Sequence, residues 1–465
     1  MTGSRSLRVR GPRAALLAVA LSAALTGLAA SPATAFAAPA GAAEIDIKYD
    51  EFTLPNGLRV IVHTDRKAPI VAVNLWYHVG SKNEQPGRTG FAHLFEHLMF
   101  QGSENHDAEY FAPFELVGVT DQNGTTNQDR TNYFQNVPTT ALDMALWMES
   151  DRMGHLLGAI NQKSLDEQRG VVQNEKRQGE NQPYGRRINA KIFEALYPAG
   201  HPYNWQVIGS MADLDAATLD DVKTWFKSWY GPNNAVLVLS GDIDVKTAKE
   251  KVTRYFGDIP ASATLADMPT NIPKRDKDTR ETVPDRVPQT RVYRAWPVAE
   301  IGTSDAVLLD LFSQVLGGSA ASRFDMRLVH GDKIADNAAA YTWSSELAGT
   351  FFLMATAKDG VDAAKIEKAM DEELQRLLAE GPTAEELERA KVATRAGFVR
   401  GIERIGGFGG KSDVLAQCVV FTGKPDCYKT DLADIDAATP ASVQAAAQRW
   451  LGVGSHTLVV QPSET

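Results

Sequence analysis

The sequence predicts an α+β fold made of two similar domains, each a mostly antiparallel sheet packed with helices. Three observations lead to this prediction. The chain has 465 residues, more than one compact domain usually holds. Segments with the two-residue period of strands alternate with segments that have the period of helices. The order of these segments repeats in the second half of the chain, which indicates an internal duplication.

The first 43 residues have the composition of a secretory signal peptide. Four Arg precede an apolar run at 14–30, and small-residue sites such as Ala33-Thr34-Ala35 follow it. The alternative is a membrane anchor, but the run is rich in Ala and short for a spanning helix of about 20 strongly apolar residues. We therefore predict a secreted protein, extracellular or periplasmic, that has no stable membrane anchor after signal cleavage.

The charge of the chain argues against nucleic acid as a partner. The net charge is −10, and removing a signal with four Arg and no acidic residue makes the remainder more acidic. Nucleic-acid binding favours clustered Lys and Arg instead. The two cysteines, Cys418 and Cys427, are nine positions apart and could form a local disulfide in an exported chain. The alternative is a pair of free, buried thiols.

The first domain is expected over residues 44–262. A hairpin is predicted around the turn Pro55-Asn56-Gly57, with its strands inside 45–62. The other predicted elements are strands over 71–78 and 235–239 and helices over 91–101, 139–157, 164–177 and 245–256.

The second domain is expected over residues 289–465, after a linker at 263–288 that is rich in Pro and charged residues. Its segments follow the order of the first domain. The pairs are Val292–Trp296 with Asn74–Tyr77, Leu311-Phe312 with Leu94-Phe95, and Thr457–Val460 with Ala235–Leu239. The order of the elements, more than residue identity, supports the duplication.

The segment His93-Leu94-Phe95-Glu96-His97 has the strongest chemical signal in the chain. Each helical residue advances about 100°, so His93, Glu96 and His97 fall within about a third of the circumference. Two imidazoles one turn apart can bind one metal ion, and Glu96 then lies beside whatever the ion holds. The order H-x-x-E-H is the inverzincin signature. The alternative is a surface helix with two incidental His.

A third metal ligand is expected from the helix predicted over 164–177. A catalytic zinc ion takes three protein ligands and keeps one open position. Glu175 follows Val172 and Val171 by three and four residues, so we expect it to project from the core-facing stripe. A lone buried carboxylate is costly, and a bound cation would offset that cost. The alternative partner is a neighbouring cation such as Lys176.

Four segments together resemble the pitrilysin / mitochondrial-processing-peptidase family. They read "GFAHLFEHLMFQGS", "NGTTNQDRTNYFQNVP", "RGVVQNEKRQGENQPYG" and "YGPNNAVLVLSGDID". The resemblance implies a zinc metalloendopeptidase that binds one Zn²⁺ per chain through His93, His97 and Glu175. Glu96 would activate the water, and the substrates would be peptides or unfolded polypeptide segments. It also implies that the two domains form half of a chamber that encloses the peptide.

The resemblance assigns different roles to the two domains. Residues 44–262 would be the zinc-binding peptidase domain, and 289–465 a peptidase-like domain without ligands. Asp310, Ser313 and Gln314 stand in the second domain where the ligands and the base would be. In the first domain, Gln168 replaces a second acid that family members often carry seven residues before the ligand Glu.

The resemblance also bears on substrate and partners. Asn123 would lie close to the scissile bond, on an edge strand that pairs with the substrate backbone; the alternative is a plain Asn-Gly turn. Active members use an Arg and a Tyr of a distant domain to hold the substrate, and here Val329 and Asp336 align with them. We therefore expect a heterodimer with a similar partner subunit rather than a homodimer. The alternative function is a non-catalytic scaffold or a peptide-binding subunit of the same fold.

Overall fold

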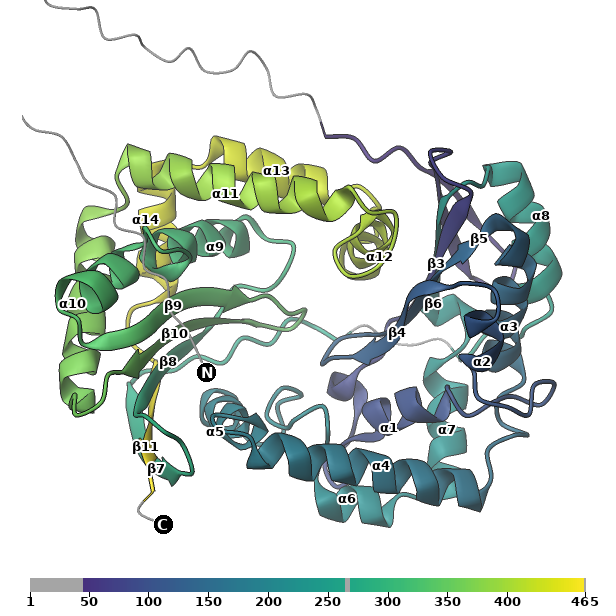
Figure 1. Cartoon of the computed structure of the whole chain (residues 1–465), viewed down its shortest axis with the longest axis horizontal. Helices are drawn as coiled ribbons and strands as arrows, with labels where there is room; N and C mark the ends of the chain where they lie inside the picture. Colours follow the sequence, from purple (N-terminus) through teal and green to yellow (C-terminus); the bar gives the residue numbers. More distant parts are fainter. Residues whose placement is uncertain (1–44, 264–267, 464–465) are drawn as a thin grey trace, which may run out of the picture. The chain divides into compact units, whose positions relative to one another are not determined.

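The computed structural model describes residues 45–263 and 268–463, so the predicted signal peptide at 1–43 lies outside the described residues. Residues from Asp46 onward form one compact unit with two β-sheets (Figure 1). We call residues 45–263 the first half and 268–463 the second half.

The first half contains a six-stranded sheet in the order β1-β2-β6-β3-β5-β4. Only β2 and β6 run parallel; every other neighbouring pair is antiparallel. The strands are β1 (Asp50–Thr53), β2 (Arg59–Thr64), β3 (Ile70–Tyr77), β4 (Thr120–Thr126), β5 (Thr131–Pro138) and β6 (Ala235–Gly241).

The second half contains a five-stranded sheet in the order β7-β11-β8-β10-β9. Its strands are β7 (Thr279–Asp285), β8 (Arg291–Val298), β9 (Ala335–Trp343), β10 (Gly349–Ala357) and β11 (His456–Pro462). Again one pair, β7 and β11, is parallel and the rest are antiparallel. Leaving β1 aside, the two sheets have the same order and the same directions, which confirms the predicted fold of two similar domains.

Helices fill the connections in the same order in both halves. The first half has α1 (Phe91–Leu98), α2 (Ala112–Glu115), α3 (Leu142–Gly154), α4 (Gln162–Asn181), α5 (Arg186–Leu196), α6 (Met211–Ala216), α7 (Leu219–Trp229) and α8 (Val245–Phe256). The second half has α9 (Ser304–Gly317), α10 (Ala363–Glu380), α11 (Ala384–Ile402), α12 (Lys411–Thr422), α13 (Tyr428–Ala437) and α14 (Pro440–Trp450). Short 3₁₀ turns are η1 (Ser81–Asn83), η2 (Thr139–Ala141) and η3 (Pro232–Asn234), and η4 (Asp325–Gly331) is π-helical.

The predicted helices and strands of the first domain are confirmed, with ends that differ by a few residues. Across residues 45–263 and 268–463, no helix is long and apolar enough to cross a membrane.

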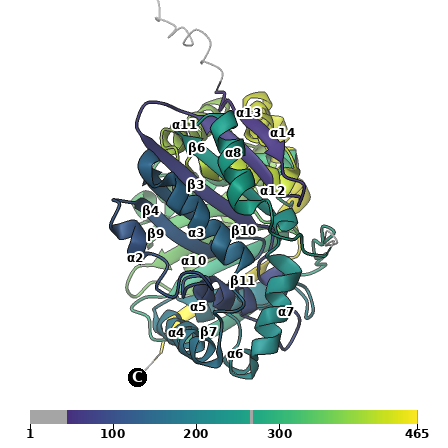
Figure 2. The same cartoon turned by 90° about the vertical axis from the view of Figure 1, so that its right-hand side faces the viewer.

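Each half covers one face of its own sheet and receives a helix from the other half on the second face. Helices α3 and α8 cover one face of the first sheet (Figure 2), where Val73 and Leu75 of β3 join the core. On the opposite face α12, from the second half, packs against β3 and β6. Reciprocally, α5 packs against β8 and β11, with Ile192 in the core of the second sheet. Burial on both faces explains why β3 and β6 are almost continuously apolar.

The second sheet begins earlier than the sequence predicts. Strand β7 lies inside the stretch predicted as linker, so the second sheet begins before residue 289. Its Pro284 is compatible with a strand because β7 is at the edge of the sheet and pairs only with β11.

Cys418 on α12 and Cys427 before α13 are joined in a disulfide, so the alternative of free thiols is wrong.

Candidate metal centre

Helix α1 presents the H-x-x-E-H segment because its opposite side is anchored in the core. Phe91, Leu94, Phe95 and Leu98 are buried in the first-half core. His93 and His97 lie on the other side and are only half-buried. The apolar and the metal-binding residue types therefore separate onto two faces of one short helix, as the sequence spacing predicts.

A buried carboxyl group holds the start of α1. Glu84 accepts hydrogen bonds from the backbone N–H groups of Gly90 (3.0 Å) and Ala92 (2.9 Å), and from Trp205 Nε1 (3.1 Å). These bonds satisfy N–H groups that a helix start otherwise leaves without partners. Burial raises the pKa of Glu84 to about 8, against the lowering effect of the hydrogen bonds. Glu84 was not predicted from the sequence, because it lies before the start of α1 and outside the helical pattern of apolar residues.

The three predicted ligands come together between α1 and α4. His93 Nε2 lies 3.7 Å from Glu175 Oε2, and His97 Nε2 lies 3.5 Å from Glu175 Oε1. One ligand atom from each residue can be chosen so that all lie within 4.8 Å of one another. Zinc bonds of 2.0–2.1 Å in tetrahedral geometry place ligand atoms about 3.4 Å apart. The donor set and its spacing therefore fit a zinc ion.

Burial keeps both imidazoles in the neutral form that binds metals. Loss of hydration, with smaller contributions from the neighbouring His97 and Arg186, lowers the pKa of His93 to about 3. Burial also lowers the pKa of His97, against opposing effects of Glu175 and of a hydrogen bond with Gln168. Gln168, the residue in place of the second acid, thus contacts a ligand.

Glu96 lies on α1 between the two His but is not part of the group that could hold a metal ion. The residue is 9% exposed, and its Oε2 has no hydrogen-bond partner among the described residues. Burial raises the pKa of Glu96 to about 7, while a hydrogen bond with the Thr126 side chain and the charge of Arg130 lower it. A pKa near neutrality suits a group that must both accept and return a proton.

Glu175 reaches the cluster, but the expected reason for its position is wrong. Its side chain is 37% exposed, and Val171, one turn before it, is 41% exposed. Val172 is buried, so the core-facing stripe of α4 runs through that residue and not through Glu175. The cost of burying a lone carboxylate therefore does not explain Glu175, whereas its approach to the two imidazoles does.

Asn123 lies on β4, which is the outer strand of the first sheet. It pairs with Phe134 of β5 and is exposed, and its Oδ1 accepts a hydrogen bond from Gly124 N (2.9 Å). The alternative of a plain Asn-Gly turn is wrong, because the hairpin turn follows Thr126. The expected edge strand is therefore present.

A cavity of about 210 Å³ opens beside His93. Apolar and aromatic side chains form much of its wall, including Phe193, Trp205 and, from the second half, Trp343. Arg186, Thr126 and Gln128 add polar groups. None of these lining residues was predicted from the sequence, because they come from separated elements.

The second half has no comparable cluster. Among residues 45–263 and 268–463, His93, His97 and Glu175 are the only group of three or more His, Cys, Asp or Glu that could hold a metal ion. Arg327, near the aligned Val329, forms ion pairs with Asp332 and Glu373 within the second half.

Two family models match the chain. One, described as insulinase (peptidase family M16), matches residues 59–201, and the other, described as the peptidase M16 inactive domain, matches residues 216–393. The chain belongs to the pitrilysin, or M16, family of peptidases. The resemblance seen in the sequence is thereby confirmed.

Relatives within this family are named zinc proteases. The zinc protease PqqE of Helicobacter pylori is 29% identical over 364 residues, which cover 77% of this chain and 80% of PqqE. A solved protease structure from Helicobacter pylori matches with a TM-score of 0.82 and 26% identity, over 89% of this chain and all (100%) of that one. The structure of the periplasmic protease PqqL from Escherichia coli shares the fold, with a TM-score of 0.74 and 20% identity. That match covers 91% of this chain but 48% of PqqL.

Proposed function

We propose that this M16 chain is an exported zinc metalloendopeptidase that hydrolyses peptides or unfolded polypeptide segments. The observation that carries the proposal is the convergence of His93, His97 and Glu175 beside the buried carboxyl group of Glu96. Three neutral or anionic ligands and an adjacent base are the set that catalytic zinc sites in peptidases use. The names of the relatives agree with this chemistry.

In the proposed reaction His93, His97 and Glu175 hold one zinc ion per chain. When bound, zinc polarises the scissile carbonyl and lowers the pKa of a coordinated water to about 7. Glu96 takes the proton of the attacking water and passes it to the leaving nitrogen. Strand β4, which ends at Thr126, packs against α1 and so lies beside that carboxyl group.

The substrate is proposed to bind as an added strand on β4. The outer edge of β4 has no neighbouring strand in the sheet, so its backbone groups can pair with an extended peptide. Asn123 would contact the peptide near the scissile bond. Peptides and unfolded segments present free extended backbone more readily than folded domains do, so this mode favours them.

We further propose that residues 1–43 form a signal peptide and that the mature chain acts with a similar partner subunit. The whole fold matches about half of the length of PqqL, as expected for a chain that supplies one of two halves. Val329 and Asp336 replace the substrate-binding Arg and Tyr, so a heterodimeric partner would supply them. Mixing this chain with candidate partners should raise peptidase activity and particle size together. Full activity from a pure homodimer would contradict the heterodimer.

The metal assignment is tested with Glu175→Gln and a matched control on the same helix. Glu175→Gln should lose zinc, measured by elemental analysis, with an unchanged circular dichroism spectrum. Glu167→Gln, at a surface carboxylate paired only with Lys163, should keep about one zinc per chain. Full zinc occupancy in Glu175→Gln would overturn the ligand set, and a wild-type chain without zinc would favour the scaffold alternative.

A further inference from the structure

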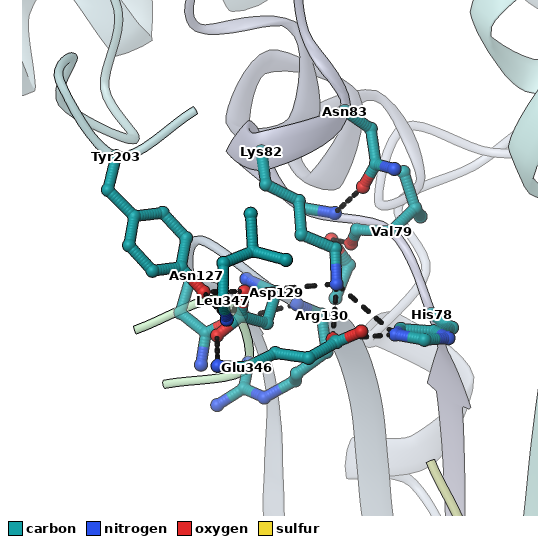
Figure 3. Close-up of polar contacts among 12 residues, drawn as sticks. His78, Val79, Lys82, Asn83, Asn127, Asp129, Arg130, Tyr203, Glu346 and Leu347 are labelled. Atoms are coloured by element: carbon teal, nitrogen blue, oxygen red, sulfur yellow. Dashed lines mark hydrogen bonds and ion pairs between the residues drawn. The ribbon is translucent and has the colours of Figure 1, made fainter. Parts of the chain in front are cut away.

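A buried polar cluster joins the two halves where two equivalent hairpin turns meet (Figure 3). One is the turn 127–130 between β4 and β5 in the first half. The other is the segment 344–348 between β9 and β10 in the second half. Because β4–β5 and β9–β10 hold the same places in the two sheets, the contact brings duplicated parts of the fold together.

The cluster contains charges that pair across the two halves. The Lys82 side chain is 2% exposed, and its ammonium group forms an ion pair with the carboxylate of Glu346 from the second half. Lys82 Nζ also lies 3.8 Å from Asp129 Oδ1, and His78 Nε2 lies 2.7 Å from Glu346 Oε2. Without the Glu346 carboxylate, the buried ammonium group of Lys82 would keep only the longer contact with Asp129, which is unfavourable for a buried charge.

Hydrogen bonds from the second half reach the turn itself. Glu346 N donates to Asp129 Oδ2 (3.0 Å), and Leu347 N donates to the Tyr203 hydroxyl (2.9 Å). The same hydroxyl donates to Asp129 Oδ1 (2.5 Å). Both carboxylate oxygens of Asp129 are therefore held, one by the second half directly and one through Tyr203.

The residues that flank Asp129 belong to the candidate active site. Thr126 and Gln128 line the cavity beside His93, and β4, which ends at Thr126, packs against α1, the helix of Glu96. Arg130 Nη1 donates to Thr125 O (2.9 Å) and so fixes the end of β4. Any movement of the turn would move these groups relative to the base.

We propose that Glu346 is a positioning residue of the peptidase site. Its carboxylate pairs with Lys82, whose backbone N–H donates to Gln128 O of the β4–β5 turn (2.9 Å). By fixing Lys82, the carboxylate holds the turn, and thereby β4, in register beside Glu96. This inference rests on the proposed peptidase function. It extends that function by giving the second half a role in binding extended substrates, because the backbone of β4 pairs with the peptide. Substrates long enough to cover β4 should depend on Glu346 more than short ones do.

The test compares Glu346→Gln with Glu281→Gln. Glu281 is a matched control because its carboxylate pairs with Lys191 of α5, another Lys–Glu contact between the halves (2.7 Å). Glu346→Gln should keep zinc but lower kcat/KM for a ten-residue peptide about tenfold, mainly by raising KM. The loss should be smaller for a four-residue peptide. Glu281→Gln should change kcat/KM for neither peptide.

Hydrogen–deuterium exchange gives a readout that does not depend on activity. Amides of residues 120–131 should exchange faster in Glu346→Gln than in the wild type and Glu281→Gln. Glu346→Asp keeps the negative charge and should restore much of the protection of residues 120–131 from exchange. It also serves as the test variant if Glu346→Gln fails to fold. Unchanged exchange at 120–131 would overturn the positioning role, as would equal losses for long and short peptides. A wild-type chain without peptidase activity, both alone and mixed with candidate partners, would contradict the proposed function, while the exchange result would still decide whether Glu346 holds β4.

Discussion

Helices α1 and α9 occupy the same place in the two halves, yet within residues 45–263 and 268–463 only α1 contributes to a group that could hold a metal ion. The sequence pairs His93 with Asp310, Glu96 with Ser313 and His97 with Gln314. In α9 the polar groups are satisfied locally: Asp310 Oδ1 accepts from Thr342 Oγ1 (3.1 Å), and Ser313 Oγ donates to Asp310 O (2.7 Å).

In α1 the corresponding groups lack such partners. Within the described residues, Glu96 Oε2 and His93 Nδ1 are buried without a hydrogen bond. Unsatisfied buried polar groups are costly and are retained where a ligand or a reaction uses them. Helix α9 therefore has a structural role, whereas α1 carries buried polar groups that have no hydrogen-bond partner among the described residues and are free to contact a metal ion or a substrate.

The largest expected effect is the loss of the base. Glu96→Gln should lower kcat about 10²–10⁴-fold, the usual contribution of a general base, while zinc content stays near one per chain. Ser313→Ala, the equivalent change in α9, should leave kcat unaltered. Peptide hydrolysis and elemental analysis of the same samples measure both. Loss of zinc from Glu96→Gln would show that Glu96 is a ligand and that the assigned roles are wrong.

Removal of the metal should affect the two halves unequally. A ligand present at 100 to 1,000 times its dissociation constant stabilises the folded state by about 3–4 kcal/mol, so a chelator should lower the free energy of unfolding by a similar amount. Hydrogen exchange should quicken in α1 and α4 and remain slow in α9. Equal changes in α1 and α9 would argue against a single site in the first half.

The start of α1 should make stability depend on pH. Burial raises the pKa of Glu84 to about 8 from an ordinary value of 4.5, so the folded state holds a proton that the unfolded state has released. This contribution is fully present below about pH 4.5 and is lost as pH rises to about 8, by roughly 5 kcal/mol. Glu84→Gln should remove that dependence, as measured by urea unfolding at several pH values. Parallel pH profiles for the variant and the wild type would contradict it.

The start of α9 should show the smallest effect. Its cap is the neutral hydroxyl of Thr303, which accepts from Ala306 N (3.3 Å). Thr303→Ala should cost about 1 kcal/mol of unfolding free energy, the usual value for a lost cap, with no change between pH 5 and 8. Chemical denaturation at both pH values provides the check. A loss that changes with pH would contradict this expectation, because the Thr303 hydroxyl at the start of α9 carries no charge, unlike Glu84 at the start of α1.

Local pattern predicted much of this protein. The strands of the first half and the helices that carry the site follow from apolar periodicity, which each segment displays by itself, and the duplication follows from the order of the segments. The order of the strands in each sheet was seen only in the structure. Residues that act across the fold were not predictable in the same way. Glu84, Trp343 and Glu346 have ordinary surroundings in the sequence and acquire a role only through contacts with distant segments.

What the sequence alone determined is the pair of His one helical turn apart with Glu96 between them, because 3.6 residues per turn places them on one face. Tertiary structure decided the rest of the site. It selected Glu175 over the other carboxylates of α4, since only the packing of α4 against α1 sets which carboxylate reaches both imidazoles. The folded structure also brings the second half into contact with the turn 127–130 near Glu96. Glu346 and Lys82 are 264 positions apart in the sequence, and no local pattern relates residues that distant.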